Sequence, residues 1–231
     1  MKPFKNTVLS SIPKAEYLLI QPNLEPFRFD QHCVLHEPMQ ELEFAYFPNS
    51  GLISLLVATE DGRTVEAGMV GKNGVIGVPL AVGLKISPLR YVVQIAGDGF
   101  RFKMERFPNR LKLTPHFQMA LSRFAVVLGM EVAQTAACNR LHELGQRLAR
   151  WLLMASNRVD SSSLPLTHDF LAATLGTDRP SVSLAAKVLE KNKIIRYKRG
   201  EIKILSVRRL ESFSCECYRE IQQFNSMLGQ K

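Results

Sequence analysis

The first half of the chain alternates short apolar segments with turn-forming residues. Between residues 16 and 107, four segments are rich in β-branched and aromatic residues, a composition typical of strands. Clusters of Gly, Asn, Asp and Pro separate them at intervals of about ten residues, which favours an antiparallel β-barrel or sandwich over βαβ units. We therefore expect residues 1–114 to form a β-barrel domain. The predicted strands are Glu43–Phe47, Leu52–Val57, Thr64–Val70 and Tyr91–Ile95.

The pattern changes after Pro108, and from about 115 to 158 only two glycines interrupt a helical periodicity. Four apolar side chains recur there at 4-3-4 spacing, the spacing of a seam that pairs with a second helix. These side chains are Phe117, Leu121, Phe124 and Leu128. We expect the helix over 115–136 to form a dimer seam; the alternative is a helix packed on its own barrel. A second apolar stripe between Leu141 and Ala155 predicts a core helix, so residues 115–157 are expected to be dimerisation and linker helices.

A helix, a glycine turn and a second helix follow within residues 167–190. Thr167 is placed to cap the first helix, and Gly176 ends it. Thr177 or Asp178 can cap the second helix, whose first turn tolerates Pro180 because N–H groups there lack helical partners. An inward stripe is expected to pack the second helix on the first. This stripe consists of Val182, Ala185 and Leu189.

A basic hairpin is predicted directly after these helices. The segments 194–197 and 201–205 alternate apolar and polar residues on either side of Lys198-Arg-Gly200. Residues 207–228 are typical of a closing helix. Residues 158–231 are therefore expected to form a winged helix-turn-helix domain, the arrangement of many proteins that bind duplex DNA.

Charge is distributed unevenly along the chain. The formal net charge is +9 and the sequence pI is about 9.6. Residues 1–60 carry four basic and seven acidic side chains, whereas residues 187–209 carry nine basic and two acidic ones. The local excess predicts a polyanionic partner near the hairpin, with an ordinary solvated basic face as the alternative.

The remaining composition excludes several other classes of protein. The four cysteines, Cys33, Cys138, Cys215 and Cys217, lack CxxC spacing, so we expect no metal site and reduced, intracellular thiols. Cys215 and Cys217 lie two apart, which on a helix would point them to different sides. The amino terminus lacks the apolar core of a signal peptide, and no apolar run is long enough to span a membrane. No catalytic motif is present, so we expect neither an enzyme nor catalytic residues.

The order of barrel, long helix, helix-turn-helix and basic wing resembles the Crp/Fnr superfamily of bacterial transcription regulators. The resemblance spans about residues 18–210 and is most specific at Leu175-Gly-Thr-Asp-Arg-Pro-Ser-Val-Ser183. It implies binding to double-stranded DNA as a homodimer, RNA polymerase as a further partner, and a cytoplasmic location. One departure concerns Leu184, where family members usually carry an arginine. Leucine cannot donate to a base but can touch a thymine methyl group, so the half-site sequence is left open.

Particular residues are expected to contact DNA. The first turns of the second helix reach base edges in the major groove, where arginine can donate two hydrogen bonds to guanine and serine can bind bases or phosphates. In the family, the start of the first helix holds a phosphate, and basic residues on the helix and wing add attraction that falls with salt. The predicted DNA-binding residues are Thr167, His168, Thr177, Arg179, Ser181, Ser183, Lys187, Lys198 and Arg199.

The segment from Gly74 to Tyr91 resembles the phosphate-binding cassette of the family. Gly74, Gly77, Arg90 and Tyr91 are the candidate effector-binding residues. The family's ribose-binding glutamate is replaced here by Val75, which would leave a ribose hydroxyl unpaired at a cost of about 1–3 kcal/mol. We therefore expect no orthodox cyclic-AMP binding, although another anionic or nucleotide effector is compatible with Arg90.

These observations predict an α+β fold with an N-terminal antiparallel jelly-roll barrel, a long dimerisation helix and a C-terminal winged helix-turn-helix. The function predicted for it is sequence-specific, DNA-binding transcription regulation, without a certain cofactor and without a membrane partner. The alternative is a ligand-binding or protein-interaction module in which the helix-turn-helix is vestigial.

Overall fold

A computed structural model describes residues 5–103 and 111–227 of the chain. Its described residues divide into two compact units. Unit 1 contains the chain up to Leu55 and residues 69–129, and unit 2 contains residues 56–68 together with the chain from Met130 onward. No helix in the described ranges is both long and apolar enough to cross a lipid bilayer.

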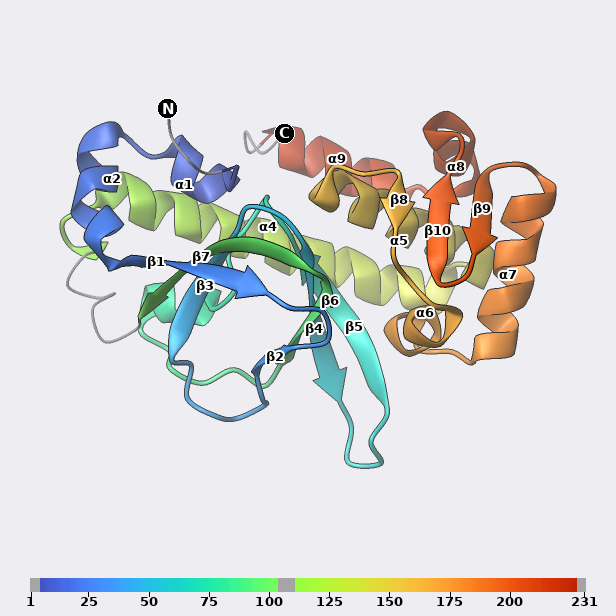
Figure 1. Cartoon of the computed structure of the whole chain (residues 1–231), viewed down its shortest axis with the longest axis horizontal. Coiled ribbons are helices and arrows are strands. Elements are labelled where there is room, and N and C mark those ends of the chain that lie inside the picture. Colours follow the sequence, from blue (N-terminus) through green and yellow to red (C-terminus); the bar gives the residue numbers. More distant parts are fainter. Residues whose placement is uncertain (1–4, 104–110, 228–231) are drawn as a thin grey trace. The chain divides into compact units, whose positions relative to one another are not determined.

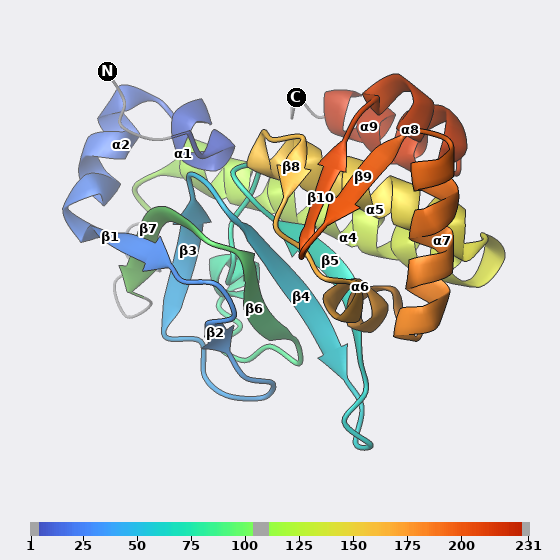
Figure 2. The ribbon, with the colours of Figure 1, turned by 45° about the vertical axis from the view of Figure 1, so that its right-hand side comes forward.

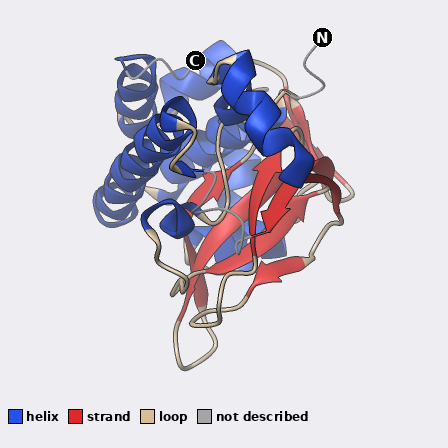
Figure 3. Cartoon of the chain, turned by 90° about the vertical axis from the view of Figure 1, so that its left-hand side faces the viewer, coloured by secondary structure: helices blue, strands red, loops and turns tan. Residues whose placement is uncertain are grey.

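Unit 1 is built around two antiparallel sheets, although residues 56–68, which include parts of two strands, belong to unit 2 (Figure 1; strands red in Figure 3). One sheet has the order β1-β7-β3 and the other β2-β6-β4-β5. In the first, Leu24 pairs with Phe102 across β1 and β7, and Phe47 pairs with Phe100 across β3 and β7. The strands are β1 (Leu24–Phe29), β2 (Val34–His36), β3 (Phe44–Pro48), β4 (Leu52–Ala58), β5 (Thr64–Val70), β6 (Arg90–Ile95) and β7 (Gly97–Lys103). The four strands predicted from the sequence are confirmed to within a residue at each end.

Short helices precede and interrupt these strands. They are α1 (Thr7–Ser11), α2 (Lys14–Ile20), η1 (Gln21–Asn23) and η2 (Val78–Val82). Asn6 caps α1 and also donates to the carbonyls of Pro48 and Gly74, at 2.9 and 2.7 Å. A fully buried side chain with three partners in this way ties the start of the chain to the strand ends.

Two long helices follow: α4 (Pro115–Leu141) and α5 (Leu144–Val159). The carboxylate of Glu16 accepts hydrogen bonds from the N–H groups of His116 and Phe117, at 3.1 and 2.9 Å, and so satisfies donors in the first turn of α4. The break between α4 and α5 comes at Glu143, where a capping box with Gln146 begins the second helix.

Unit 2 contains the end of α4, all of α5 and the C-terminal elements. The remaining elements are β8 (Ser163–Leu164), α6 (His168–Leu175), α7 (Arg179–Lys191), β9 (Ile195–Lys198), β10 (Glu201–Ile204), α8 (Val207–Phe213) and α9 (Cys217–Met227). The three short strands form one sheet in the order β8-β10-β9, beside α7 in Figure 2. A buried ion pair joins α4 to α5: Arg158 donates to Glu131 at 2.5 Å, and both side chains are about 5% exposed.

The α5 helix contributes nine buried residues to unit 2. Leu148, Trp151 and Ala155 lie inward, as the predicted core stripe requires, whereas Leu141 is 74% exposed and lies outside the core. The indole N–H of Trp151 donates to Glu66 of β5 at 2.7 Å. Antiparallel strands followed by a long helix and a C-terminal helix-turn-helix confirm the predicted fold class.

Candidate nucleic-acid interface

Local hydrogen bonds set the geometry of α6 and α7. Thr167 accepts from the N–H of Phe170 at 3.2 Å, and Asp178 accepts from the N–H of Ser181 at 2.8 Å, so both helices have a side-chain N-cap. Between them Gly176 takes a left-handed conformation with φ of +62°. Of the two candidate caps for α7, the structure selects Asp178. Hydrogen bonds from the N–H and hydroxyl of Ser181 hold the pKa of this carboxyl below its ordinary value, so it is ionised at the positive end of the helix.

The inner face of α7 packs against the rest of unit 2. Val182 and Leu189 are fully buried as expected. The third member of the stripe is corrected: Ala186 is fully buried, whereas Ala185 is only half-buried. Val182, Ala186 and Leu189 are spaced four and three residues apart, so they lie on one face of the helix. This face contacts α5 and α6.

The outer face of α7 is basic at its edges and apolar in its middle. Arg179 and Lys187 are exposed, and the Arg179 guanidinium lies 3.6 Å from the carboxylate of Asp169 with both side chains 67% exposed. Leu184 and Val188 are 64% and 47% exposed, one helical turn apart. An ion pair with this exposure contributes little to folding, so the arginine can exchange its partner at small cost.

The two predicted serines already have hydrogen-bond partners in the chain. The hydroxyl of Ser181 donates to Asp178 at 2.9 Å, and Oγ of Ser183 shares a hydrogen bond of 2.9 Å with Nδ1 of His168. Each retains a hydroxyl lone pair for a further contact. Their present role is to fix the start of α7.

His168 joins the two helices to the hairpin. Its ring stacks on Tyr197 of β9, with centroids 4.0 Å apart, while Nδ1 contacts Ser183 of α7. Burial of the ring, with the cation of Arg179 nearby, lowers the pKa of His168 below its ordinary value of 6.5. His168 is therefore neutral at neutral pH and acts as a spacer between three elements.

The hairpin that follows α7 has a two-residue turn. Arg199 and Gly200 both have positive φ, +48° and +81°, as the tight turn of a twisted hairpin requires. Lys198 and Arg199 are exposed at the tip, and the N–H of Tyr197 donates to Glu190 of α7 at 2.7 Å. The predicted basic wing is thus present and hydrogen-bonded to α7.

The cassette-like segment lies in unit 1, where its charged residue already has a carboxylate partner. Arg90 donates from Nη2 and Nε to Glu37, at 2.9 and 3.2 Å. Tyr91 is buried, and its hydroxyl donates to Ser87 at 2.8 Å. A Cβ at Gly74 would lie 2.1 Å from the ring of Phe124, so this glycine permits close packing of α4 on the segment.

Gly77 of the same segment has a φ of +88°, a conformation that favours glycine. It allows the chain to turn from the bridge between Tyr46 and Ile76 into η2. Gly74 and Gly77 therefore each have a structural role in the barrel.

The predicted dimer seam on α4 is corrected. Phe117, Leu121 and Phe124 are at most 2% exposed and belong to the core of unit 1, and Leu128 packs partly buried against it. The alternative from the sequence, a helix packed on its own barrel, describes this face. The outward face of α4 carries Met119, Val126 and Met130, each more than 50% exposed.

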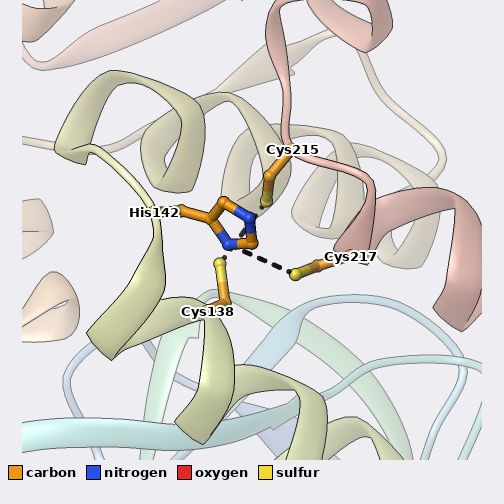
Figure 4. Close-up of side chains that lie close together, drawn as sticks. All are labelled: Cys138, His142, Cys215 and Cys217. Carbon is orange, nitrogen blue, oxygen red and sulfur yellow. Dashed lines mark hydrogen bonds between the residues drawn. The ribbon is translucent and has the colours of Figure 1, made fainter.

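Three cysteines and a histidine meet in unit 2, which the sequence analysis did not anticipate (Figure 4). The expectation that no ligand set converges is corrected, since Cys138 and His142 lie four residues apart at the end of α4. Cys215 and Cys217 both face them, because Cys215 precedes α9 and only Cys217 lies within it. The i, i+4 spacing was visible in the sequence, but contact between segments 77 residues apart was not.

Residues 146–213 match the family model of the Crp-like helix-turn-helix domain. In fold, the chain is similar to FixK2 from Bradyrhizobium japonicum, with a TM-score of 0.72 and 15% identity over 83% of this chain and 98% of that one. For the c-di-GMP-responsive global regulator CLP from Xanthomonas campestris the TM-score is 0.69 at 14% identity, over 84% and 100% of the two chains. A CRP-family transcriptional regulator from Thermus thermophilus gives 0.67 at 18% identity, over 81% and 96%. No curated protein sequence matches the chain.

Proposed function

We propose that this chain, which has the fold of the Crp/Fnr transcription regulators and carries a Crp-like helix-turn-helix domain, is a sequence-specific DNA-binding regulator of transcription. The observation that carries the proposal is the exposed outer face of α7, capped at its start by Asp178 and hydrogen-bonded to a basic hairpin through Glu190. A helix presented in this way fits the major groove, and the hairpin tip fits the phosphate backbone beside it.

The residues of that face suggest how bases are read. Arg179 at the first turn is placed to donate to guanine, and the apolar pair Leu184 and Val188 is suited to thymine methyl groups. Lys187, Lys198 and Arg199 supply contacts to phosphates that carry no sequence information. Thr167, His168, Ser181 and Ser183 position α6 and α7. The hydroxyl groups of Thr167, Thr177, Ser181 and Ser183 are candidates for phosphate contacts.

We assign the dimer interface to the outward face of α4. Positions 119, 126 and 133 are seven residues apart, as are 122, 129 and 136, and all six are exposed. The larger apolar side chains on the face are Met119, Val126 and Met130, while Gly129 and Ala133 allow close approach of a second helix. A second copy of this chain is the natural partner, because the heptad spacing is that of a two-helix seam and half-sites read by a dimer lie about one helical turn apart.

The barrel is proposed to respond to something other than cyclic AMP. Support comes from the pairing of Arg90 with Glu37 and from Val75, which is buried and offers no polar atom to a ribose. An anionic or nucleotide effector at this place would have to displace the Glu37 carboxylate from Arg90. We further propose RNA polymerase as a partner and the cytoplasm as the location, since a regulator of transcription works where both are found.

Selection of genomic fragments by the purified full chain tests this function. Sequencing of the retained fragments should yield a two-fold symmetric motif whose half-sites are about one helical turn apart. Retention without a shared motif would favour the second candidate function, a ligand-binding or interaction module with a vestigial helix-turn-helix. The specific observation behind that alternative is that Ser181 and Ser183 are both hydrogen-bonded within the chain while Leu184 stands exposed between α7's basic residues.

A further inference from the structure

Four potential metal ligands from two distant parts of the chain meet inside unit 2. Sulfur atoms of Cys138, Cys215 and Cys217 and a ring nitrogen of His142 all lie within 4.8 Å of one another. The four side chains point toward a common centre in Figure 4. We propose that this Cys3His cluster binds one zinc ion, and that the ion fastens the segment between α8 and α9 to the end of α4.

The geometry fits a single tetrahedral ion. Cys138 Sγ and Cys215 Sγ are 3.5 Å apart, and Cys217 Sγ is 3.5 Å from Nδ1 of His142. In a tetrahedral site with metal–sulfur bonds of about 2.3 Å and metal–nitrogen bonds of about 2.0 Å, the ligand atoms are separated by about 3.5–3.8 Å. The cluster therefore needs only a small contraction around one ion, and the soft thiolate and imidazole set favours zinc over oxygen-seeking cations.

The helices present the ligands without strain. Cys138 lies in the last turn of α4 and His142 directly follows that helix. The N–H of His142 still donates to the Cys138 carbonyl at 3.1 Å, so the helical spacing of the two residues is kept. Cys215 stands in the loop before α9, and Cys217 is the first residue of that helix. The loop conformation thus turns both thiols to one side, which an unbroken helix would not do.

The hydrogen bonds around the four candidate ligands match those found around metal-binding residues. His142 presents Nδ1 to the cluster, and its other nitrogen, Nε2, hydrogen-bonds to the Glu216 carboxylate at 3.1 Å. Metal-bound histidines commonly donate their second N–H to a carboxylate, which fixes the tautomer and the ring orientation. Gln134 donates from Nε2 to Cys217 Sγ at 3.1 Å, so this sulfur also has a hydrogen-bond partner outside the cluster.

The charge of the surroundings gives an independent reason for an anionic centre. Arg150 is 2% exposed, and its side chain donates to Thr135 Oγ1 and Met154 Sδ, both at 3.2 Å. Among the described residues no carboxylate forms an ion pair with it, although it interacts electrostatically with Cys138. A buried cation requires a counter-charge. Zinc with three thiolates and a neutral imidazole carries a net charge of −1, which would supply one.

Binding is a proton exchange without redox chemistry. The zinc ion forms bonds to three sulfur atoms and one nitrogen, and the three thiols release their protons to water. Simple packing of small apolar side chains would explain the buried thiols but not a histidine held by Glu216 with its other nitrogen turned inward. A Cys138–Cys215 disulfide would need an oxidant and would leave Cys217 and His142 without a shared role.

The test uses the purified full chain, prepared under reducing conditions. We expect one zinc ion per chain by elemental analysis, and replacement by cobalt(II) should give the visible spectrum of a tetrahedral site with sulfur-to-metal charge-transfer bands. Cys138→Ser and Cys217→Ser should each abolish stoichiometric binding. Cys33→Ser is the matched control, because Cys33 is exposed and lies outside the cluster, and it should bind as the unaltered chain does.

A second variant keeps the test valid if a cysteine variant fails to fold. Glu216→Gln leaves all four ligands in place and should weaken zinc affinity by about 10- to 100-fold, as loss of an outer-shell partner does. Three results would each overturn the proposal: no stoichiometric metal and no tetrahedral cobalt spectrum, unchanged affinity in Cys138→Ser and Cys217→Ser, or a Cys138–Cys215 disulfide detected by mass spectrometry in the reduced preparation. These readouts do not involve DNA, so they stand apart from the proposed regulatory function.

Discussion

His168 shows how one side chain links three elements of the helix-turn-helix and wing. It begins α6, bonds to Ser183 of α7 and stacks on Tyr197 of the wing. Its Nε2 atom is buried and has no hydrogen-bond partner in the described structure. Protonation would put hydrogen on both ring nitrogens, and the one on Nε2 would have no acceptor. The neutral form is therefore the one that this packing favours.

The lowered pKa of His168 predicts a pH dependence of stability. Below pH 6.5 the unfolded chain binds a proton at this position that the folded chain does not bind, so the free energy of unfolding falls as the pH falls. Above that pH the two states bind equally and the effect vanishes. Thermal unfolding should be followed between pH 5 and 8. The decrease in stability as the pH falls should be smaller in His168→Gln than in the unaltered chain. Equal pH slopes in the two proteins would refute the role assigned to this histidine.

At the scale of elements, α7 depends on its N-cap. Asp178 accepts from the N–H of Ser181 at 2.8 Å and leaves the outer face of the helix free. Asp178→Ala should reduce the free energy of unfolding by about 1 kcal/mol, whereas Asp178→Asn, which caps comparably, should cost much less. Urea unfolding of the two variants measures this difference. A similar loss in both would mean that the charge of Asp178, and not the capping bond, stabilises the helix.

The caps, the turn and the hairpin could be predicted because each depends on neighbours in the sequence. Thr167, Gly176 and Arg199-Gly200 take the conformations that their local chemistry favours. The face of α4 could not be assigned in the same way. Phe117 and Val126 are both apolar and lie at helical spacing, and only the barrel decides which of them is buried. The cysteine cluster was missed for the same reason, since its two halves are joined by tertiary folding alone.

At the scale of the whole molecule, the proposed dimer forms through the outer face of α4. Val126 is 58% exposed near the middle of that face, so Val126→Glu should place two buried charges in the seam and shift the protein toward monomer. Sedimentation velocity measures the change. Val82→Glu is the matched control, because Val82 is 73% exposed and lies on η2, outside α4. Equal sedimentation of the two variants would remove α4 as the interface.

Family resemblance and structure agree on the architecture and leave the specificity to be measured. The fold of the Crp/Fnr regulators, inferred from the helix-turn-helix, wing and barrel, is confirmed by the domain match and by the solved structures. Under the proposed function, the base pairs that the chain reads on DNA are set by a few exposed side chains of α7. Among them Arg179 is the one best placed to distinguish a base pair.

The most direct test is fluorescence-anisotropy titration of the full chain on a selected fragment, with Arg179→Ala compared with the unaltered protein. We expect binding that weakens steeply with salt, and a loss of about 1–3 kcal/mol in the variant with relaxed preference at one base pair of each half-site. Lys198→Ala, which removes a proposed phosphate contact, should instead weaken binding to all sequences alike. Affinity that is independent of salt, or unchanged affinity and preference in Arg179→Ala, would contradict the proposal that α7 reads DNA.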